Sequence, residues 1–169
     1  MLDEQGNMVG LDQKPLPKGQ PPIPMSGIRI WSFGKSKPEA QNIFACIGYS
    51  AEPKNIAWSP DGTKFAYELW KLKGDGQREL AGIRIMDISQ ERTMIMPQDV
   101  PALTYLVAAG PEGKPQKPRW SPDSRRLVYE MAKPDGKRDL WVINADGTTP
   151  INLTKGQGDN TDAVWAPLK

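Results

Sequence analysis

Apolar and polar residues alternate in short runs from residue 27 onward. Residues 27–33 (Gly-Ile-Arg-Ile-Trp-Ser-Phe) alternate, and residues 42–47 form an apolar run of strand length. A period of two is typical of half-buried strands, and a short apolar run between turn residues is typical of buried ones. The pattern predicts two strands here, joined by a polar loop that contains Pro38.

A hairpin is predicted next, over residues 55–70, with its turn at Ser-Pro-Asp-Gly (59–62). Proline presets one backbone angle of a tight turn, aspartate bonds nearby backbone amides, and glycine accepts a positive φ. Two more short strands are expected at 82–88 and 93–96, the second of them ended by Pro97. Together these segments predict a unit of four strands.

This unit is then repeated. Residues 118–131 align with residues 56–69, and Trp, Ser, Pro, Asp, Tyr and Glu recur at the same offsets. Further strands are predicted at 139–144 and 150–154, which gives the second copy four strands as well. The chain then reaches Trp-Ala-Pro at 165–167, which starts a third copy without the serine hydroxyl.

The interval between the repeated tryptophans indicates the architecture. It is longer from Trp58 to Trp120 than from Trp120 to Trp165 by about the length of a Pro-rich insertion at 97–116. Four strands per unit, at a period of about 40 to 50 residues, are typical of β-propeller blades. We therefore expect an all-β protein.

The segments Trp-Ser-Pro-Asp-Gly at 58–62 and Trp-Ser-Pro-Asp-Ser at 120–124 resemble the Pro-Asp variant of the WD-like repeat in TolB-type β-propellers. The resemblance covers residues 26–169 and is strongest over 117–154. Such propellers usually have six blades. They occur in the periplasmic protein of the Tol system, in the gating domains of prolyl oligopeptidase-like enzymes, and in surface and scaffold proteins.

The expected fold is a partial β-propeller of about two full four-stranded blades, plus a half blade and a lone C-terminal strand. Its domain is 27–169, with the insertion at 97–116 and a Pro-rich extended arm at 1–26. The blade-like units lie near 27–48, 55–96, 117–154 and 162–168.

This set of blades does not close a ring alone. The chain is a fragment, its pieces join between chains, or a partner covers its open edges. Pairing of residues 162–169 with the sheet formed by 28–33 and 43–47 would give about three blades, so that two chains would make six.

Two groups of residues are singled out by this expectation. Partner contacts are predicted in the arm, at the strand end before a Gly-rich turn, and in the insertion, namely at Pro21, Pro22, Ile23, Trp70 and Tyr105. Structural repeat positions are expected to wedge adjacent blades together or to bond the turn backbone. These are Trp58, Pro60, Asp61, Trp120, Pro122, Asp123 and Trp165.

The composition argues against catalysis and cofactors. The sequence contains no histidine, which excludes Ser-His-Asp and Cys-His arrangements and His-ligated metal sites. It has no Gly-x-Ser-x-Gly elbow and no phosphate-binding loop, and the spacing of Asp159 and Asp162 fits no EF-hand. We therefore expect no enzyme, no cofactor and no metal.

The net charge is only +2 and the basic residues are scattered among acidic ones, so we expect no nucleic-acid partner. Cys46 stands alone in an apolar run and is expected in the core. The longest apolar stretches are too short to cross a bilayer, and the first residues lack the basic and apolar regions of a secretory signal. The cytoplasm is the default expectation, and the resemblance implies the periplasm as the alternative.

These observations favour a non-catalytic protein-binding scaffold, or an accessory structural subunit of a larger assembly, that uses open sheet edges and the N-terminal arm. The alternative is a ligand- or peptide-sensing propeller formed when identical chains close a ring. An enzymatic role would need a separate catalytic domain.

Overall fold

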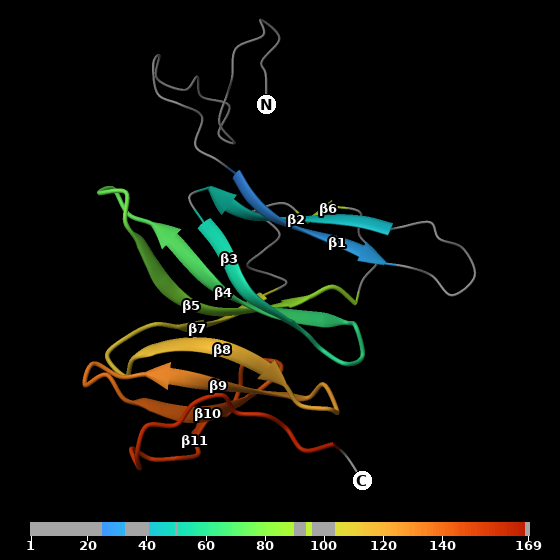
Figure 1. The fold of residues 1–169 in the computed structure, drawn as a ribbon. Coiled ribbons are helices and arrows are strands. Elements are labelled where there is room, and N and C mark those ends of the chain that lie inside the picture. Colours follow the sequence, from blue (N-terminus) through green and yellow to red (C-terminus); the bar gives the residue numbers. More distant parts are fainter. Residues whose placement is uncertain (1–24, 33–40, 50, 90–93, 96–103, 168–169) are drawn as a thin grey trace, which may run out of the picture.

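The computed structural model describes residues 25–32, 41–49, 51–89, 94–95 and 104–167 (Figure 1). These residues form strands and turns and contain no helix, so the described part of the chain has none that could span a membrane. The strands are β1 (Met25–Ser32), β2 (Gln41–Tyr49), β3 (Ala51–Trp58), β4 (Lys64–Leu72), β5 (Arg78–Asp87), β6 (Met94–Ile95), β7 (Thr104–Ala108), β8 (Lys114–Trp120), β9 (Arg126–Ala132), β10 (Arg138–Asn144) and β11 (Ile151–Asn152).

Two four-stranded antiparallel sheets form the centre of the molecule. In the first blade the order is β3-β4-β5-β7, and in the second blade it is β8-β9-β10-β11. Each sheet is a meander in which the Trp-Ser-Pro-Asp turn joins the first strand to the second. This is the strand order of propeller blades, so the all-β, partial-propeller expectation is confirmed.

A third sheet, the partial blade, has the order β1-β2-β6. Its strands β1 and β2 are antiparallel, and β6 pairs with β2 in parallel through only two residue pairs. The sequence places a strand at 93–96 as the fourth strand of the first blade, and this is wrong. That edge is taken by β7, whose five residues pair with β5 and whose Val107 packs into the core between the blades, because a longer ladder with an apolar face is the more stable partner.

The strand β4 supplies both cores of the stack because its side chains alternate between its two faces. Phe65, Tyr67 and Leu69 pack with Ile28 of the partial blade, whereas Ala66 faces the second blade. Phe65, Ala66 and Tyr67 are 0% exposed. The partial, first and second blades therefore stack in chain order, as Figure 1 shows.

The lone C-terminal strand is not formed, because residues 162–167 carry no strand assignment. They lie against the second blade, where the indole Nε1 of Trp165 donates to the carbonyl oxygen of Arg119 at 3.1 Å. The partial blade and the C-terminal segment lie at opposite ends of the stack (Figure 1), so the pairing expected between residues 162–169 and the sheet of 28–47 does not occur in the described residues.

Candidate binding surfaces

The two Ser-Pro-Asp turns are built by the same hydrogen bonds. Ser59 Oγ donates to Asp61 Oδ1 at 2.6 Å, and Ser121 Oγ donates to Asp123 Oδ1 at 2.5 Å. Each carboxylate also accepts a backbone N–H from two residues onward. The serine hydroxyl, and then the backbone N–H, hold the pKa of both aspartates below the ordinary value. These carboxylates are therefore committed to their own turns, with Pro60 and Pro122 at the turn corners.

The second turn departs from the first at a position that links the two blades. Gly62 has a φ of 72°, and Ser124 takes the same place with a φ of 60°. Positive φ strains a residue that has a side chain. The buried Ser124 hydroxyl accepts the Asp61 backbone N–H at 3.0 Å from the neighbouring blade. Ser124 therefore lacks the backbone freedom of a glycine at this position, but its hydroxyl adds a hydrogen bond between the two turns.

The repeated tryptophans link each unit to the one before it. Trp120 Nε1 donates to the carbonyl oxygen of Ala57 at 3.0 Å, and Trp165 Nε1 donates to that of Arg119 at 3.1 Å. In both cases the acceptor is the residue just before the preceding repeat tryptophan. The contact therefore follows the repeat.

A second contact follows the same register. Lys117 N donates to Glu68 Oε1 at 2.9 Å, and Asp162 N donates to Glu130 Oε1 at 2.8 Å. Both donors have positive φ, at 51° and 55°, and both precede a repeat tryptophan by three positions. The two glutamates are 3% and 1% exposed. We call each pair of contacts, from the tryptophan indole and from the residue three positions before it, a clasp.

Sequence reasoning did not assign a role to Glu68 and Glu130. The available signal was an acidic residue inside an apolar strand, after tyrosine in both copies. A buried carboxylate needs hydrogen-bond donors. Asn55 Nδ2 and Trp70 Nε1 supply two more to Glu68, at 2.7 and 3.1 Å. For Glu130 the Lys117 ammonium supplies one at 3.2 Å.

The first blade carries the donor half of a third clasp. Asn55 has a positive φ of 49°, close to the values of Lys117 and Asp162 at the same repeat position, and Trp58 follows it by three residues. No described residue makes the equivalent contacts with Asn55 and Trp58. Trp58 is 45% exposed, whereas Trp120 is 8% exposed. One repeat tryptophan therefore wedges between blades, and another of the same type faces outward.

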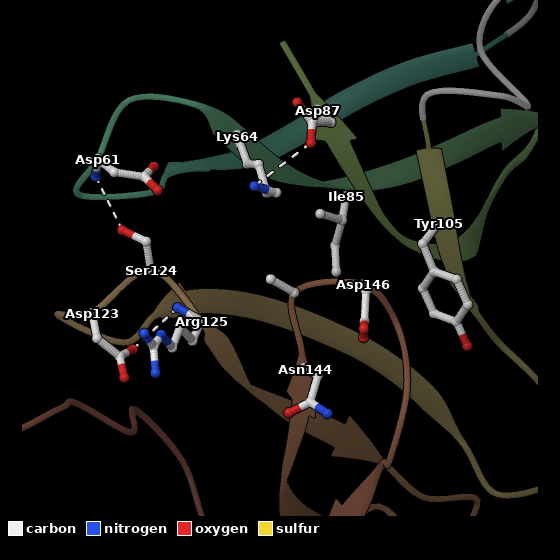
Figure 2. A pocket seen from close by; sticks show the side chains of 11 residues that line it. Asp61, Lys64, Ile85, Asp87, Tyr105, Asp123, Ser124, Arg125, Asn144 and Asp146 are labelled. Carbon is white, nitrogen blue, oxygen red and sulfur yellow. Dashed lines mark hydrogen bonds and ion pairs between the residues drawn. The ribbon is translucent and has the colours of Figure 1, made fainter. Parts of the chain in front are cut away.

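An open groove of about 770 Å³ lies between the ends of the two blades (Figure 2). In the first blade, Lys64 and Asp87 form an ion pair at 3.6 Å on one wall. Burial raises the pKa of Asp87, but the hydrogen bonds from Ser89 and the charge of Lys64 lower it by more. The pKa therefore lies below its ordinary value, and the carboxyl is ionised at neutral pH. The remaining lining residues are Asp61, Ile85, Tyr105, Asp123, Ser124, Arg125, Asn144, Ala145 and Asp146.

The groove carries more negative than positive side chains, but its acids are already bonded. Asp146 Oδ1 accepts from the N–H and hydroxyl of Thr148, and these bonds lower its pKa. The described acidic residues form no cluster of metal-binding type. The groove therefore offers charge and shape without a preorganised ligand set.

The predicted partner contacts lie in three different places. Trp70 is half-buried and covers Glu68, and the Lys54 Nζ lies 4.9 Å from the centroid of its ring. Tyr105 is 40% exposed on β7, at the mouth of the groove in Figure 2. The structure does not bring these two together into one described site. The arm residues lie outside the described ranges, namely Pro21, Pro22 and Ile23.

No protein-family model matches the chain. Solved structures with a similar chain path include a protein assigned as TolB from Agrobacterium tumefaciens, at 24% sequence identity and a TM-score of 0.40, which covers 62% of this chain and 30% of that one. TolB from Acinetobacter baumannii matches at 14% identity and a TM-score of 0.44, over 76% of this chain and 26% of that one. The chain thus spans less than a third of either protein. The assignment of this chain as a partial propeller rests on the strand order of this chain and on its repeated clasps.

Proposed function

We propose that this chain is a non-catalytic protein-binding module that joins a larger assembly through the exposed side of its first blade. The observation that carries the proposal is the half clasp at Asn55 and Trp58. A large aromatic side chain that is buried in one copy of a repeat and 45% exposed in another marks a surface built for contact.

The surroundings of Trp58 fit the same role. Ile56 is 46% exposed and lies two residues before Trp58, in the irregular part of β3, so a second exposed apolar side chain lies next to the tryptophan along the chain. The ring of Trp58 packs at a tilt on the ring of Phe65, with 5.4 Å between the ring centroids, and this contact holds the indole in place. A positioned aromatic ring loses little entropy on binding. Strand edges also favour this function, because an uncovered edge invites uncontrolled association.

The absence of histidine from the sequence and the commitment of Asp61 and Asp123 to their turns argue for binding rather than catalysis. A ring of identical chains that senses a ligand is the alternative. The groove favours it, since a lined hollow between blades is the kind of place where a closed ring would hold a small molecule.

The mass of the isolated chain, measured by light scattering after size exclusion, separates these two functions. A binding module is expected to run as a monomer, or to aggregate through its open face until its partner is added. A stable closed dimer or trimer would contradict the module and support the sensing ring.

Site-specific photo-crosslinking then tests which surface is used. A photoreactive residue at position 58 should trap the partner in cells of the source organism, whereas the same residue at exposed Asp75, in the β4–β5 turn, should not. Equal trapping at both positions would contradict a specific surface around Trp58.

A further inference from the structure

We infer that the edge of β1 that no described strand covers, together with the exposed face of β3, binds a β-hairpin from another polypeptide, whose second strand carries a buried glutamate. This inference rests on the proposed function and names the partner's chemistry. It is derived from the repeated geometry of the two complete blades.

The first step is the place of β1 and β2 in the stack. Residues 27–30 read Gly-Ile-Arg-Ile, as do residues 82–85 of β5. The strand β3 contacts β1 and β2 as β8 contacts β5 and β7. Ile28 enters the core between the partial and first blades, and Ile83 enters the next core along. Thus β1 and β2 occupy the places of the third and fourth strands of a blade.

The second step is what those places require. In the first blade β5 pairs with β4 on one side and β7 on the other. In the partial blade β1 pairs with β2, and no described strand takes the side that corresponds to β4. The strand β8 also packs on β3 and β4, which are the first and second strands of the preceding blade. The first and second strands of the partial blade, which would pack against β3, are therefore missing from the described residues.

The third step fixes the chemistry of the second missing strand. Glu68 on β4 lies opposite Ile83 on β5, so a glutamate paired to β1 in the same register lies opposite Ile28. There it accepts the Asn55 N–H, as Glu68 accepts that of Lys117. Its neighbours are tyrosine before it and leucine or methionine after it, as in 67–69 and 129–131.

The first missing strand supplies the other half of the clasp. Its penultimate carbonyl accepts the Trp58 indole, in the way that the Ala57 carbonyl accepts that of Trp120. The occupant is thus a hairpin of both strands. Main-chain pairing to β1 provides affinity, and the glutamate and the carbonyl provide register.

A second copy of this chain fits the site less well. Its two hairpins of this kind, β3–β4 and β8–β9, are already part of its own blades. Its segment 162–167 keeps the repeat tryptophan contact but forms no strand. The hairpin is therefore assigned to another polypeptide.

The probes are two synthetic peptides with the sequences of residues 55–72 and 117–132, which contain Glu68 and Glu130. Calorimetric titration into the full chain should show binding of at least one. Glu68→Gln or Glu130→Gln in that peptide should weaken binding about tenfold, because the charge-assisted bond to the backbone N–H is lost. Trp58→Phe in the chain should weaken it by a smaller factor.

Hydrogen exchange gives the position. Docking should protect the amides of β1 and leave those of β9 unchanged. No binding of either peptide, equal binding of the glutamine peptides, or protection away from β1 would overturn the inference. So would a dimer in which β1 is already protected without peptide, which would assign the site to a second copy. Partner trapping at position 58 combined with failure of both peptides would leave the proposed function standing and reject the hairpin.

Discussion

At the residue scale, the repeat tryptophan is buried at Trp120 and exposed at Trp58, so the same substitution can be compared in the two environments. Trp120→Phe removes the indole donor to Ala57 while keeping an aromatic ring in a buried site. We expect it to lower the free energy of unfolding by about 1–3 kcal/mol, because a ring volume and a buried hydrogen bond are lost together. Trp58→Phe is the control and should change stability by less than about 0.5 kcal/mol. Urea unfolding followed by circular dichroism measures both, and equal losses would contradict the half clasp.

Asp139 gives a pH dependence whose sign follows from its contacts. Burial raises its pKa, but hydrogen bonds from Asn152, Thr154 and the Gly156 N–H, with the charge of Lys133, lower it below the ordinary value of 3.8. The carboxylate therefore stabilises the fold fully above the ordinary pKa, and the contribution is lost as pH falls through the lower folded value.

Asp139→Asn should remove that contribution, at a cost of about 1–3 kcal/mol near neutral pH, because the bonds to Asp139 tie β10 to the loop after β11. Denaturant unfolding at about pH 7 and about pH 3 tests this. The variant should lose less stability on acidification than the parent. A parallel fall in both proteins would contradict the assignment.

The sequence predicts the turns better than it predicts the buried glutamates. Serine, proline and aspartate form the turn within a few residues, so their roles are local and visible in the pattern. Glu68 bonds to Lys117, 49 positions away. A contact over that distance depends on how blades stack, and a single repeated acid gives no indication of its donor.

At the element scale, the difference between local and long-range contacts explains the error over the fourth strand of the first blade. Residues 93–96, which are ended by Pro97, and residues 103–107, which lie between Pro101 and Pro111, both read as short apolar islands. Which of them pairs with β5 depends on ladder length and on packing against the second blade, and neither is visible locally. The C-terminal segment shows a related limit, since Trp165 keeps its repeat contact without forming a strand.

The strand β7 makes a contact that can be tested against a matched glycine. A Cβ on Gly147 would lie 2.1 Å from the Tyr105 ring, whereas one on Gly136 would meet nothing within 4 Å. Their φ values are 81° and 83°, so alanine pays the same backbone cost at both. Gly136→Ala should cost about 1 kcal/mol, and Gly147→Ala about 1–3 kcal/mol more through displacement of Tyr105. Thermal unfolding of the two variants checks this, and equal losses would mean that Tyr105 moves away freely.

At the scale of the whole molecule, the repeat pattern is enough to predict stacked blades, because each copy carries its own turn and strands. It does not predict how strongly the blades are coupled. In the structure the first and second blades are coupled by one apolar core and one clasp, whereas the partial blade joins the first blade through an apolar core without a complete clasp among the described residues. Stability in such arrays is set by nearest-neighbour contacts.

Glu68 tests that coupling, because it bonds Asn55 and Trp70 in its own blade and Lys117 in the next. Glu68→Gln keeps the shape but removes the charge, and should lower stability by about 1–3 kcal/mol. Native-state hydrogen exchange should show the opening free energy of β4–β5 and of β9–β10 falling by the same amount, since both blades lose the shared contact.

Glu79→Gln is the control. Glu79 forms an exposed ion pair with Lys73, with 46% of its side chain accessible, and such pairs contribute little. Exchange of both sheets should stay unchanged in that variant. If Glu68→Gln loosened the first blade alone, the blades would open independently, and the clasp would act as a local cap for β4 rather than as the bond that joins one blade to the next.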